Sequence, residues 1–245
     1  MSEFKGGVFL IDKPAGLSSF GIVRRVKKLL GIKKVGHAGT LDPFATGLLI
    51  VCGGRPATKM ISSFMDGEKE YLATLYLGRR TTTLDPEGDI VDERDVPHLN
   101  EKEIEQCLSH FRGDLMQRPP SYSAVKYKGK PLYHYARKGI TIEKEPRPVT
   151  IYELERCGER GAVGPIHPLL KLRVVCSKGT YIRTLADDIG TKLGCGAYLQ
   201  ELRRTRSGVF SVQQAIRGDD LLEPSEYERV MAGMMSVEDV QKLLQ

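Results

Sequence analysis

The sequence contains no tryptophan, a single asparagine, and only five cysteines and five histidines among its 245 residues. No two cysteines lie within four residues of each other, which excludes the paired spacing typical of small zinc modules. Because the cysteine count is odd and a chain of this size does not need disulfides, we interpret the cysteines as reduced thiols in a cytosolic protein. The histidines are equally scattered, and we therefore expect no metal site.

Long hydrophobic runs are also missing. The longest apolar run, Leu48 to Cys52, is far too short to span a bilayer. The first residues do not form the apolar core of a signal peptide, because Lys5, Asp12 and Lys13 interrupt them. We therefore expect a cytoplasmic protein that does not bind a membrane.

Several motifs of common enzyme classes are absent as well. The sequence has no Gly-x-x-x-x-Gly-Lys-Ser/Thr phosphate loop and no Gly-x-Gly-x-x-Gly dinucleotide loop. It also lacks the Gly-x-Ser-x-Gly turn that presents a nucleophilic serine. These absences exclude the usual nucleotide-dependent and serine-hydrolase machinery.

Positive charge is present in excess. Lysine and arginine number 37 against 31 acidic residues, and the isoelectric point is about 9.0. This balance suits a polyanionic partner, although charge alone is weak support for one. The cations Arg24, Arg25, Lys27 and Lys28 fall on the outer face of a predicted helix, which is either a solvated surface or an RNA contact. Residues 117–148 interleave basic residues with tyrosines, which indicates either RNA contact or an exposed loop whose tyrosines pack on the core.

The hydrophobic pattern predicts a mixture of helices and strands that do not alternate regularly, so we expect an α+β fold. The most secure element is a helix after the capping box Asn100-Glu101-Lys102-Glu103, with Gly113 as its end. The other predicted helices span residues 18–30, 57–64, 181–193 and 237–244, and the predicted strands span residues 8–11, 46–52, 71–77, 149–157, 169–176 and 209–212.

The segment from Gly36 to Pro43 is the most unusual local feature. It holds a histidine, two glycines and Asp42, and we predict a loop in which the glycines allow tight backbone geometry and Pro43 stiffens the exit. A stiff loop can hold a carboxylate in a fixed direction, as covalent catalysis requires. Spacing alone favours a turn in which Asp42 only caps the following segment.

A set of segments in fixed order resembles the TruB family of pseudouridine synthases. The resemblance extends over residues 7–210. The matching segments are Gly7-Val8-Phe9-Leu10-Ile11-Asp12-Lys13-Pro14-Ala15-Gly16-Leu17-Ser18-Ser19, Val35-Gly36-His37-Ala38-Gly39-Thr40-Leu41-Asp42-Pro43-Phe44-Ala45-Thr46-Gly47-Leu48-Leu49, Lys69-Glu70-Tyr71, Arg118-Pro119-Pro120-Ser121-Tyr122-Ser123-Ala124-Val125-Lys126, Gly179-Thr180-Tyr181-Ile182-Arg183-Thr184-Leu185 and Leu202-Arg203-Arg204-Thr205.

The resemblance implies the pseudouridine synthase fold, with a mixed, mostly antiparallel sheet flanked by helices and loops. It implies an isomerase that flips uridine 55 out of the T-loop of tRNA and converts it to pseudouridine, with the T-stem-loop as its RNA partner. No cofactor and no metal are implied, and we expect a monomer. We expect residues 1–215 to form the catalytic domain and residues 216–245 a short helical tail without a complete PUA domain, which family members usually carry.

The same resemblance assigns catalytic roles. Asp42 would be the nucleophile, and Arg183 would pair with its carboxylate and hold it ionised and aimed. Tyr71 would stack on the flipped uracil and assist removal of its C5 proton.

The remaining expected site residues bind the substrate. Tyr181 and Leu202 would line the base pocket together with Tyr71. His37 would enter the T-loop and occupy the space left by the extruded base. Lys13 would support the active-site loop from the first motif.

Two other functions remain possible from the sequence. A basic, tyrosine-rich surface would also suit an RNA-folding chaperone in which modification is secondary. A catalytic subunit of a guide-RNA particle would share the Gly-Thr-Leu-Asp-Pro segment, but it would require protein partners. We expect a stand-alone enzyme, because the absence of a further C-terminal domain disfavours the guide-RNA alternative.

Overall fold

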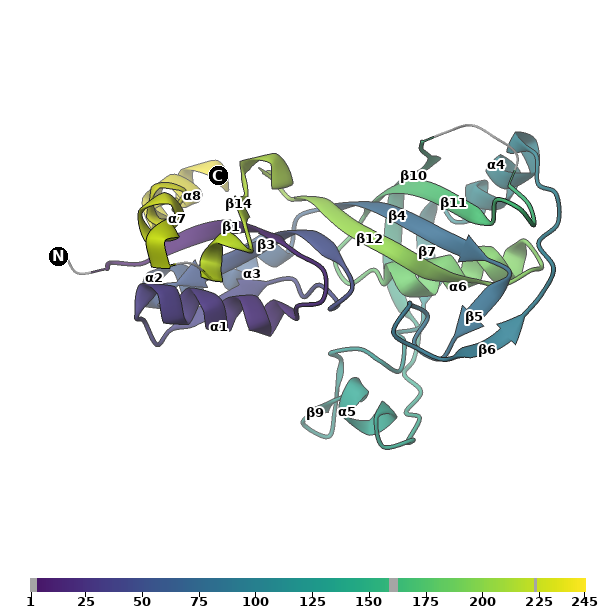
Figure 1. Ribbon diagram of the computed structural model, residues 1–245, viewed down its shortest axis with the longest axis horizontal. Helices are drawn as coiled ribbons and strands as arrows, with labels where there is room; N and C mark the ends of the chain where they lie inside the picture. The colour runs from purple at the N-terminus through teal and green to yellow at the C-terminus, as the bar shows by residue number, and fades with distance from the viewer. Residues whose placement is uncertain (1–3, 159–162, 223) are drawn as a thin grey trace. The chain divides into compact units, whose positions relative to one another are not determined.

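The computed structural model of the chain describes residues 4–158, 163–222 and 224–245. The chain forms two compact units (Figure 1). Unit 1 comprises Met1–Tyr71 and Leu202–Gln245, and unit 2 comprises Leu72–Glu201. The chain therefore leaves unit 1 after Tyr71 and returns to it at Leu202. Within the described residues, no helix is long and apolar enough to cross a membrane.

Unit 1 is built on a sheet in which β3 (Thr46–Gly53) is central. One edge of β3 pairs along its length with antiparallel β1 (Gly7–Lys13). The other edge is shared, because antiparallel β2 (Val35–Ala38) pairs with the end of β3, while parallel β12 (Ala197–Ser207) pairs with its beginning. The short strand β13 (Phe210–Ser211) pairs with β12. The segment between β2 and β3 therefore starts and ends beside β12.

Helices cover both faces of this sheet, which explains why its central strands are continuously apolar. Along β1, Phe9 and Ile11 join the core cluster that contains Ile22 of α1 (Ser19–Leu30). Val8 and Leu10 point to the opposite face, where they join a second cluster. Short helices α2 (Gly54–Thr58) and α3 (Ile61–Met65) contribute to that second cluster.

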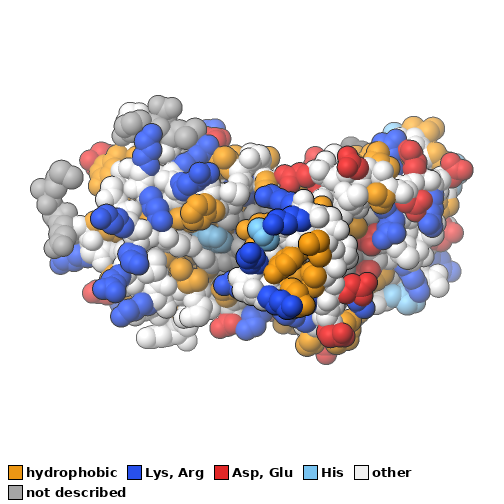
Figure 2. All heavy atoms as spheres, turned by 90° about the horizontal axis from the view of Figure 1, so that it is seen from below, with side chains coloured by type: hydrophobic (Ala, Val, Ile, Leu, Met, Phe, Trp, Pro, Cys, Tyr) orange, Lys and Arg blue, Asp and Glu red, His pale blue; other side chains and the backbone are white. Residues whose placement is uncertain are grey.

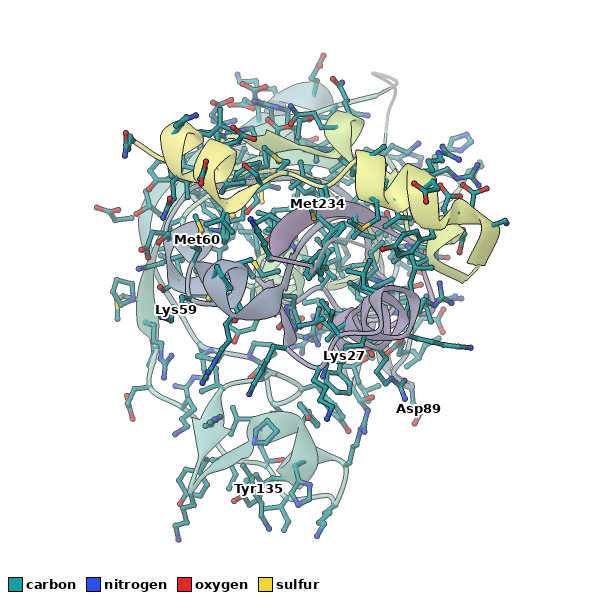
Figure 3. All side chains as sticks on the ribbon, turned by 90° about the vertical axis from the view of Figure 1, so that its left-hand side faces the viewer. Lys27, Lys59, Met60, Asp89, Tyr135 and Met234 are labelled. Atoms are coloured by element: carbon teal, nitrogen blue, oxygen red, sulfur yellow. The ribbon has the colours of Figure 1, made fainter. Side chains whose placement is uncertain are left out.

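The C-terminal residues also belong to unit 1. Strand β14 (Ile216–Arg217) pairs in parallel with β1, and Met235 exchanges two backbone hydrogen bonds with Val8, at 3.0 and 2.9 Å. The 3-10 turns η1 (Val212–Gln214), η2 (Asp220–Leu222) and η3 (Pro224–Glu226) lead to α7 (Tyr227–Ala232) and α8 (Val237–Leu243). Met234, between these two helices, lies beside β1 (Figure 3). The outer edge of β1 is therefore covered.

Unit 2 has its own run of paired strands, in the order β12, β4 (Lys69–Leu77), β11 (Leu169–Cys176), β10 (Arg147–Arg156) and β7 (Gly113–Gln117). Helix α4 (Glu101–Ser109) packs on α6 (Ile182–Lys192), and the Cys107 thiol lies 3.9 Å from the Ile189 carbonyl oxygen. A separate hairpin pairs β5 (Arg79–Thr81) with β6 (Ile90–Glu93). Strands β8 (Lys126–Tyr127) and β9 (Lys130–Pro131), with α5 (Leu132–Ala136), project from the rest of this unit (Figure 1).

The α+β prediction is confirmed, since the large sheet contains both parallel and antiparallel pairs and is flanked by helices. The helix at residues 18–30 is also confirmed, with Ser18 as its cap, as is the capping box of α4. Three local predictions are wrong. Residues 57–64 form parts of two helices, because Met60 makes a tighter turn by donating to the Ala57 carbonyl. Helix α4 ends at Ser109, and Gly113, with φ of 85°, begins β7 instead. His37 lies in strand β2, so the loop is shorter than predicted.

Candidate active site

The loop that carries Asp42 connects β2 to β3 in unit 1. Gly39 turns the chain out of β2 with φ of 75°, a left-handed conformation that glycine adopts without steric cost. Asp42 is half-buried, and its carbonyl accepts a hydrogen bond from the Ala45 amide at 3.2 Å. The nucleophile predicted from the resemblance is therefore on a short, turned segment between two strands.

A serine of helix α1 fixes the middle of this loop. The Ser19 hydroxyl donates to the Leu41 carbonyl at 3.0 Å and accepts from the Leu41 amide at 2.8 Å. Ser19 is buried, so both hydrogen bonds are shielded from water. The sequence does not indicate this role. Ser18 and Ser19 are equally good candidates for the helix cap, so the sequence does not show that Ser18 caps the helix and leaves Ser19 to bind the loop.

Lys13, at the end of β1, fixes the far side of the loop. Its side chain is fully buried, and Nζ donates to the carbonyls of Pro14 at 2.8 Å, Leu17 at 2.6 Å and Pro43 at 3.1 Å. Three carbonyl acceptors match the three donors of an ammonium group. The structure therefore places Lys13 where it joins the first motif to the residue after Asp42.

Arg204, in β12, contacts the beginning of the loop at Gly39. It is buried, and its guanidinium donates from Nε to the Leu48 carbonyl at 2.7 Å and from Nη2 to the Gly39 carbonyl at 2.9 Å. In the sequence Arg204 belongs to a cluster of basic residues, Arg203, Arg204 and Arg206, for which we predicted no strand. The cluster is in fact part of a long strand, in which neighbouring side chains point to opposite faces.

His37 lies in β2, which shares one edge of β3 with the strand of Arg204, β12. Burial, and to a smaller extent the positive charge of Arg204, lower the pKa of the His37 imidazole from its ordinary value. The neutral form of His37 is therefore favoured at neutral pH.

Tyr71 and Leu202 lie at the positions where the chain leaves and re-enters unit 1. Both are nearly buried, with 9% and 8% of their surfaces exposed. Their strands are neighbours in unit 1, because the Thr205 hydroxyl of β12 donates to the Glu70 carboxylate of β4 at 2.7 Å. The Leu202 carbonyl accepts from the Thr46 hydroxyl at 3.4 Å, which links it to the start of β3.

The other two expected site residues, Tyr181 and Arg183, lie in unit 2 at the beginning of α6. The backbone of Tyr181 is fixed by Gln117, whose amide side chain accepts from the Tyr181 amide at 2.7 Å and donates to its carbonyl at 3.0 Å. Arg183 is buried and lies 3.3 Å from the buried carboxylate of Asp85. It also donates to the carbonyls of Thr83 at 2.9 Å and Tyr122 at 2.8 Å.

The structure thus brings five of the expected residues into unit 1 and two into unit 2. The residues in unit 1 are Lys13, His37, Asp42, Tyr71 and Leu202. Sequence reasoning missed Ser19, Arg204 and Asp85. Asp85 reads as an ordinary turn residue in the segment Asp85-Pro86-Glu87-Gly88-Asp89, and nothing in its spacing links it to Arg183.

Two surfaces carry the basic residues that the sequence singled out. Figure 2 shows lysine and arginine side chains over the α1 side of unit 1. In the projecting part of unit 2, Tyr127 packs edge-on against Tyr135, with Lys144 4.8 Å from the centre of the Tyr127 ring. Tyr133 is 41% exposed and lies beside Arg137. This projecting part therefore offers exposed cations and at least one exposed aromatic ring.

Among the described residues, no cluster of histidine, cysteine and acidic side chains could hold a metal ion.

Comparison with known families matches nearly the whole chain. Residues 27–182 match the TruB family pseudouridylate synthase (N terminal domain), and residues 183–243 match the tRNA pseudouridylate synthase B C-terminal domain. The chain is 60% identical over 243 residues to the tRNA pseudouridine synthase B of Desulfotalea psychrophila, covering 99% of this chain and 98% of that protein. It is 49% identical over 215 residues to the enzyme of the same name from Haemophilus influenzae, covering 88% of this chain and 68% of that protein.

Solved structures show the same fold. The chain superposes on a chain of a Cbf5-Nop10-Gar1 complex with a TM-score of 0.71 and 32% identity. It superposes with a TM-score of 0.68 and 29% identity on a chain from an H/ACA RNP bound to a substrate RNA containing 2'-deoxyuridine. In both cases the match covers 95% of this chain and 60% of the other chain.

Proposed function

Since the chain belongs to the TruB family of pseudouridylate synthases, we propose that it converts uridine 55 in the T-loop of tRNA to pseudouridine. The observation that carries this proposal is the match over almost the whole length of a tRNA pseudouridine synthase B. The chain is 60% identical to that bacterial protein but only 32% and 29% identical to the chains of the Cbf5-Nop10-Gar1 complex and the H/ACA RNP, which favours a stand-alone tRNA enzyme.

In this proposal Asp42 is the nucleophile. Its carboxylate attacks C1′ of the target nucleoside as the bond between C1′ and uracil N1 breaks, and the freed uracil turns. C1′ then bonds to C5 as its bond to the Asp42 carboxylate breaks, the C5 proton leaves, and N1 gains a proton, so the enzyme is regenerated and the product has the same atoms as the substrate. Because nothing is oxidised, reduced or transferred to another molecule, the reaction requires no cofactor. The hydrogen bonds to Leu41 and Pro43 support this role, because they fix the backbone on both sides of Asp42.

The other site residues act around the flipped base. Arg183 keeps the Asp42 carboxylate ionised and directed, and Tyr71 stacks on the uracil and assists removal of the C5 proton. Tyr181 and Leu202 line the pocket. His37 fills the space that the base leaves in the T-loop.

Lys13 holds the catalytic loop, for which its hydrogen bond to Pro43 is the support. All seven site residues lie in residues 1–215, which we propose as the catalytic domain, with residues 216–245 as its helical tail. The basic α1 surface and the projecting part of unit 2 bind the T-stem-loop through phosphates and stacked bases. We propose that the enzyme acts as a monomer in the cytoplasm.

The test uses a T-stem-loop RNA with a single target uridine, without guide RNA or protein partners. The Asp42→Asn variant should form no pseudouridine and should bind the RNA within about threefold of the wild type, because only the nucleophile is lost. Asp95→Asn is the matched control, since Asp95 is an exposed carboxylate. Wild-type turnover by Asp42→Asn would refute the proposal. Refolding of misfolded tRNA by Asp42→Asn would show a separate chaperone activity.

A further inference from the structure

Arg204 occupies an unusual place for a charged residue. In the register of β12 and β3, Arg203 lies beside Thr46 and Arg204 beside Gly47. Arg203 points to the face where Asp12 accepts its guanidinium at 2.9 and 2.7 Å, and it stays partly exposed. Arg204 points to the opposite face, with only 2% of its surface exposed. Two adjacent arginines therefore have different surroundings.

The guanidinium of Arg204 joins the two ends of the catalytic loop. Gly39 is the first loop residue after β2, and Leu48 lies just inside β3. Their carbonyls accept from Nη2 and Nε of the same planar group, at 2.9 and 2.7 Å. The group also lies close against Gly39, because a Cβ atom added there would be 3.2 Å from Nη1. One rigid side chain thus sets the separation and direction of the segment from which Asp42 projects.

The need to fill space in the core does not explain why position 204 is an arginine. Within the described part of the chain, no carboxylate forms an ion pair with Arg204, and its hydrogen-bond partners are backbone carbonyls. Burying a guanidinium without an ion pair is unfavourable, and an apolar side chain of similar volume would fill the same space without that desolvation cost. What an apolar side chain cannot supply is a pair of donors in fixed geometry.

Arg204 also completes a regular pattern. The carbonyls of Gly39, Leu41 and Pro43 each accept from a buried side chain, namely Arg204, Ser19 and Lys13. The three side chains come from β12, α1 and β1, so they approach the loop from different elements. Asp42 lies between the second and third of these fixed carbonyls.

We propose that Arg204 is a positioning residue for the Asp42 nucleophile, acting through the backbone of residues 39–48 and not through contact with the RNA. This inference rests on the proposed function of Asp42. It implies that a positive charge at position 204 is insufficient and that the two-pronged guanidinium is required. A lysine there would keep the charge but could not donate from a rigid fork to both carbonyls.

The test compares Arg204→Lys with Arg203→Lys, which makes the same replacement on the same strand at the partly exposed position. For Arg204→Lys we expect the single-turnover rate at saturating T-stem-loop to fall by about 100-fold, because a displacement near 1 Å has this effect on positioned groups. The dissociation constant for the RNA should stay within about threefold of the wild type. Arg203→Lys should keep the wild-type rate. A rate within threefold of wild type for Arg204→Lys, or a rate loss matched by an equal loss of RNA affinity, would overturn the proposal.

A second measurement does not depend on activity. Deuterium uptake by amides of residues 36–48 should rise in Arg204→Lys and not in Arg203→Lys, because the loop loses an anchor. Unchanged uptake in Arg204→Lys would also overturn the proposal. If the wild type forms no pseudouridine, the proposed function fails, and the uptake still decides whether Arg204 positions the loop.

If Arg204→Lys does not fold, a substitution in the loop at Gly39 tests the same contact between the loop and the guanidinium. Gly39→Ala would press a methyl group against the guanidinium, whereas Gly31→Ala has a similar positive φ, 65° against 75°, and no atom within 4 Å. Gly39→Ala should then show the loss of rate with RNA affinity kept. Equal rates for the two alanine variants would overturn the proposal.

Discussion

Replacing Gly47 by alanine should destabilise unit 1 far more than an ordinary glycine substitution. Gly47 lies in β3 with φ of 101°, a backbone conformation that costs an L-residue about 1–2 kcal/mol. An added Cβ would overlap the Arg204 carbonyl oxygen and would lie 2.7 Å from the Arg204 amide nitrogen. Ordinary contact needs about 3.5 Å, so β12 and β3 would have to move apart by about 1 Å. Forced overpacking of this kind costs about 1–3 kcal/mol.

Together these effects predict a loss of about 2–5 kcal/mol from the free energy of unfolding. The measurement is urea denaturation followed by far-ultraviolet circular dichroism, with Gly31→Ala as the control. Gly31 has φ of 65° with no atom within 4 Å of an added Cβ, so only the backbone cost of about 1–2 kcal/mol remains. Equal losses for the two variants would refute the steric reasoning, because they differ mainly in the contact with Arg204.

Two further predictions concern buried ionisable groups. Lys13→Met should lower the free energy of unfolding by about 3 kcal/mol or more, because three carbonyls lose a charged donor, and a stability equal to wild type in urea would contradict this. The pKa of His37 is lowered, so as the pH falls below its ordinary value of 6.5 the unfolded chain binds a proton before the folded chain does and stability is lost. The drop in urea midpoint between pH 7.5 and pH 5.5 should therefore be smaller in His37→Gln than in the wild type, and an equal drop would exclude the effect.

The elements that sequence reasoning found are those whose signals are local. Helix α1 and the capping box of α4 depend on side chains within a few residues of one another, and both lie where they were predicted. Strands β7, β12 and β14 were missed because their signal is a partner strand elsewhere in the chain. In β12 the closely spaced Arg203, Arg204 and Arg206 hide any strand pattern, although the strand pairs with β3 and Arg204 is buried.

The residues of the candidate site also divide into those that the sequence indicates and those that only the folded structure brings together. Asp42 could be singled out because motifs around it resemble those of a known family. The groups that hold its loop could not be singled out in this way. Ser19 and Arg204 bind backbone carbonyls, and because every residue has one, the sequence does not show which carbonyls are bound. Asp85 was missed because its partner Arg183 is brought close only by the folding of unit 2.

The path of the chain also sets an order of assembly during synthesis. Unit 1 begins first, but the part of β12 that belongs to it starts at Leu202, after the whole of unit 2, Leu72–Glu201. At ordinary translation rates the synthesis of unit 2 takes on the order of 10 s, and during that time β3 has no parallel strand to pair with. Unit 2 can therefore finish folding on the ribosome before unit 1 does. The nascent chain acquires Arg204 only after that delay, and the catalytic loop is among the last parts of the protein to reach its final form.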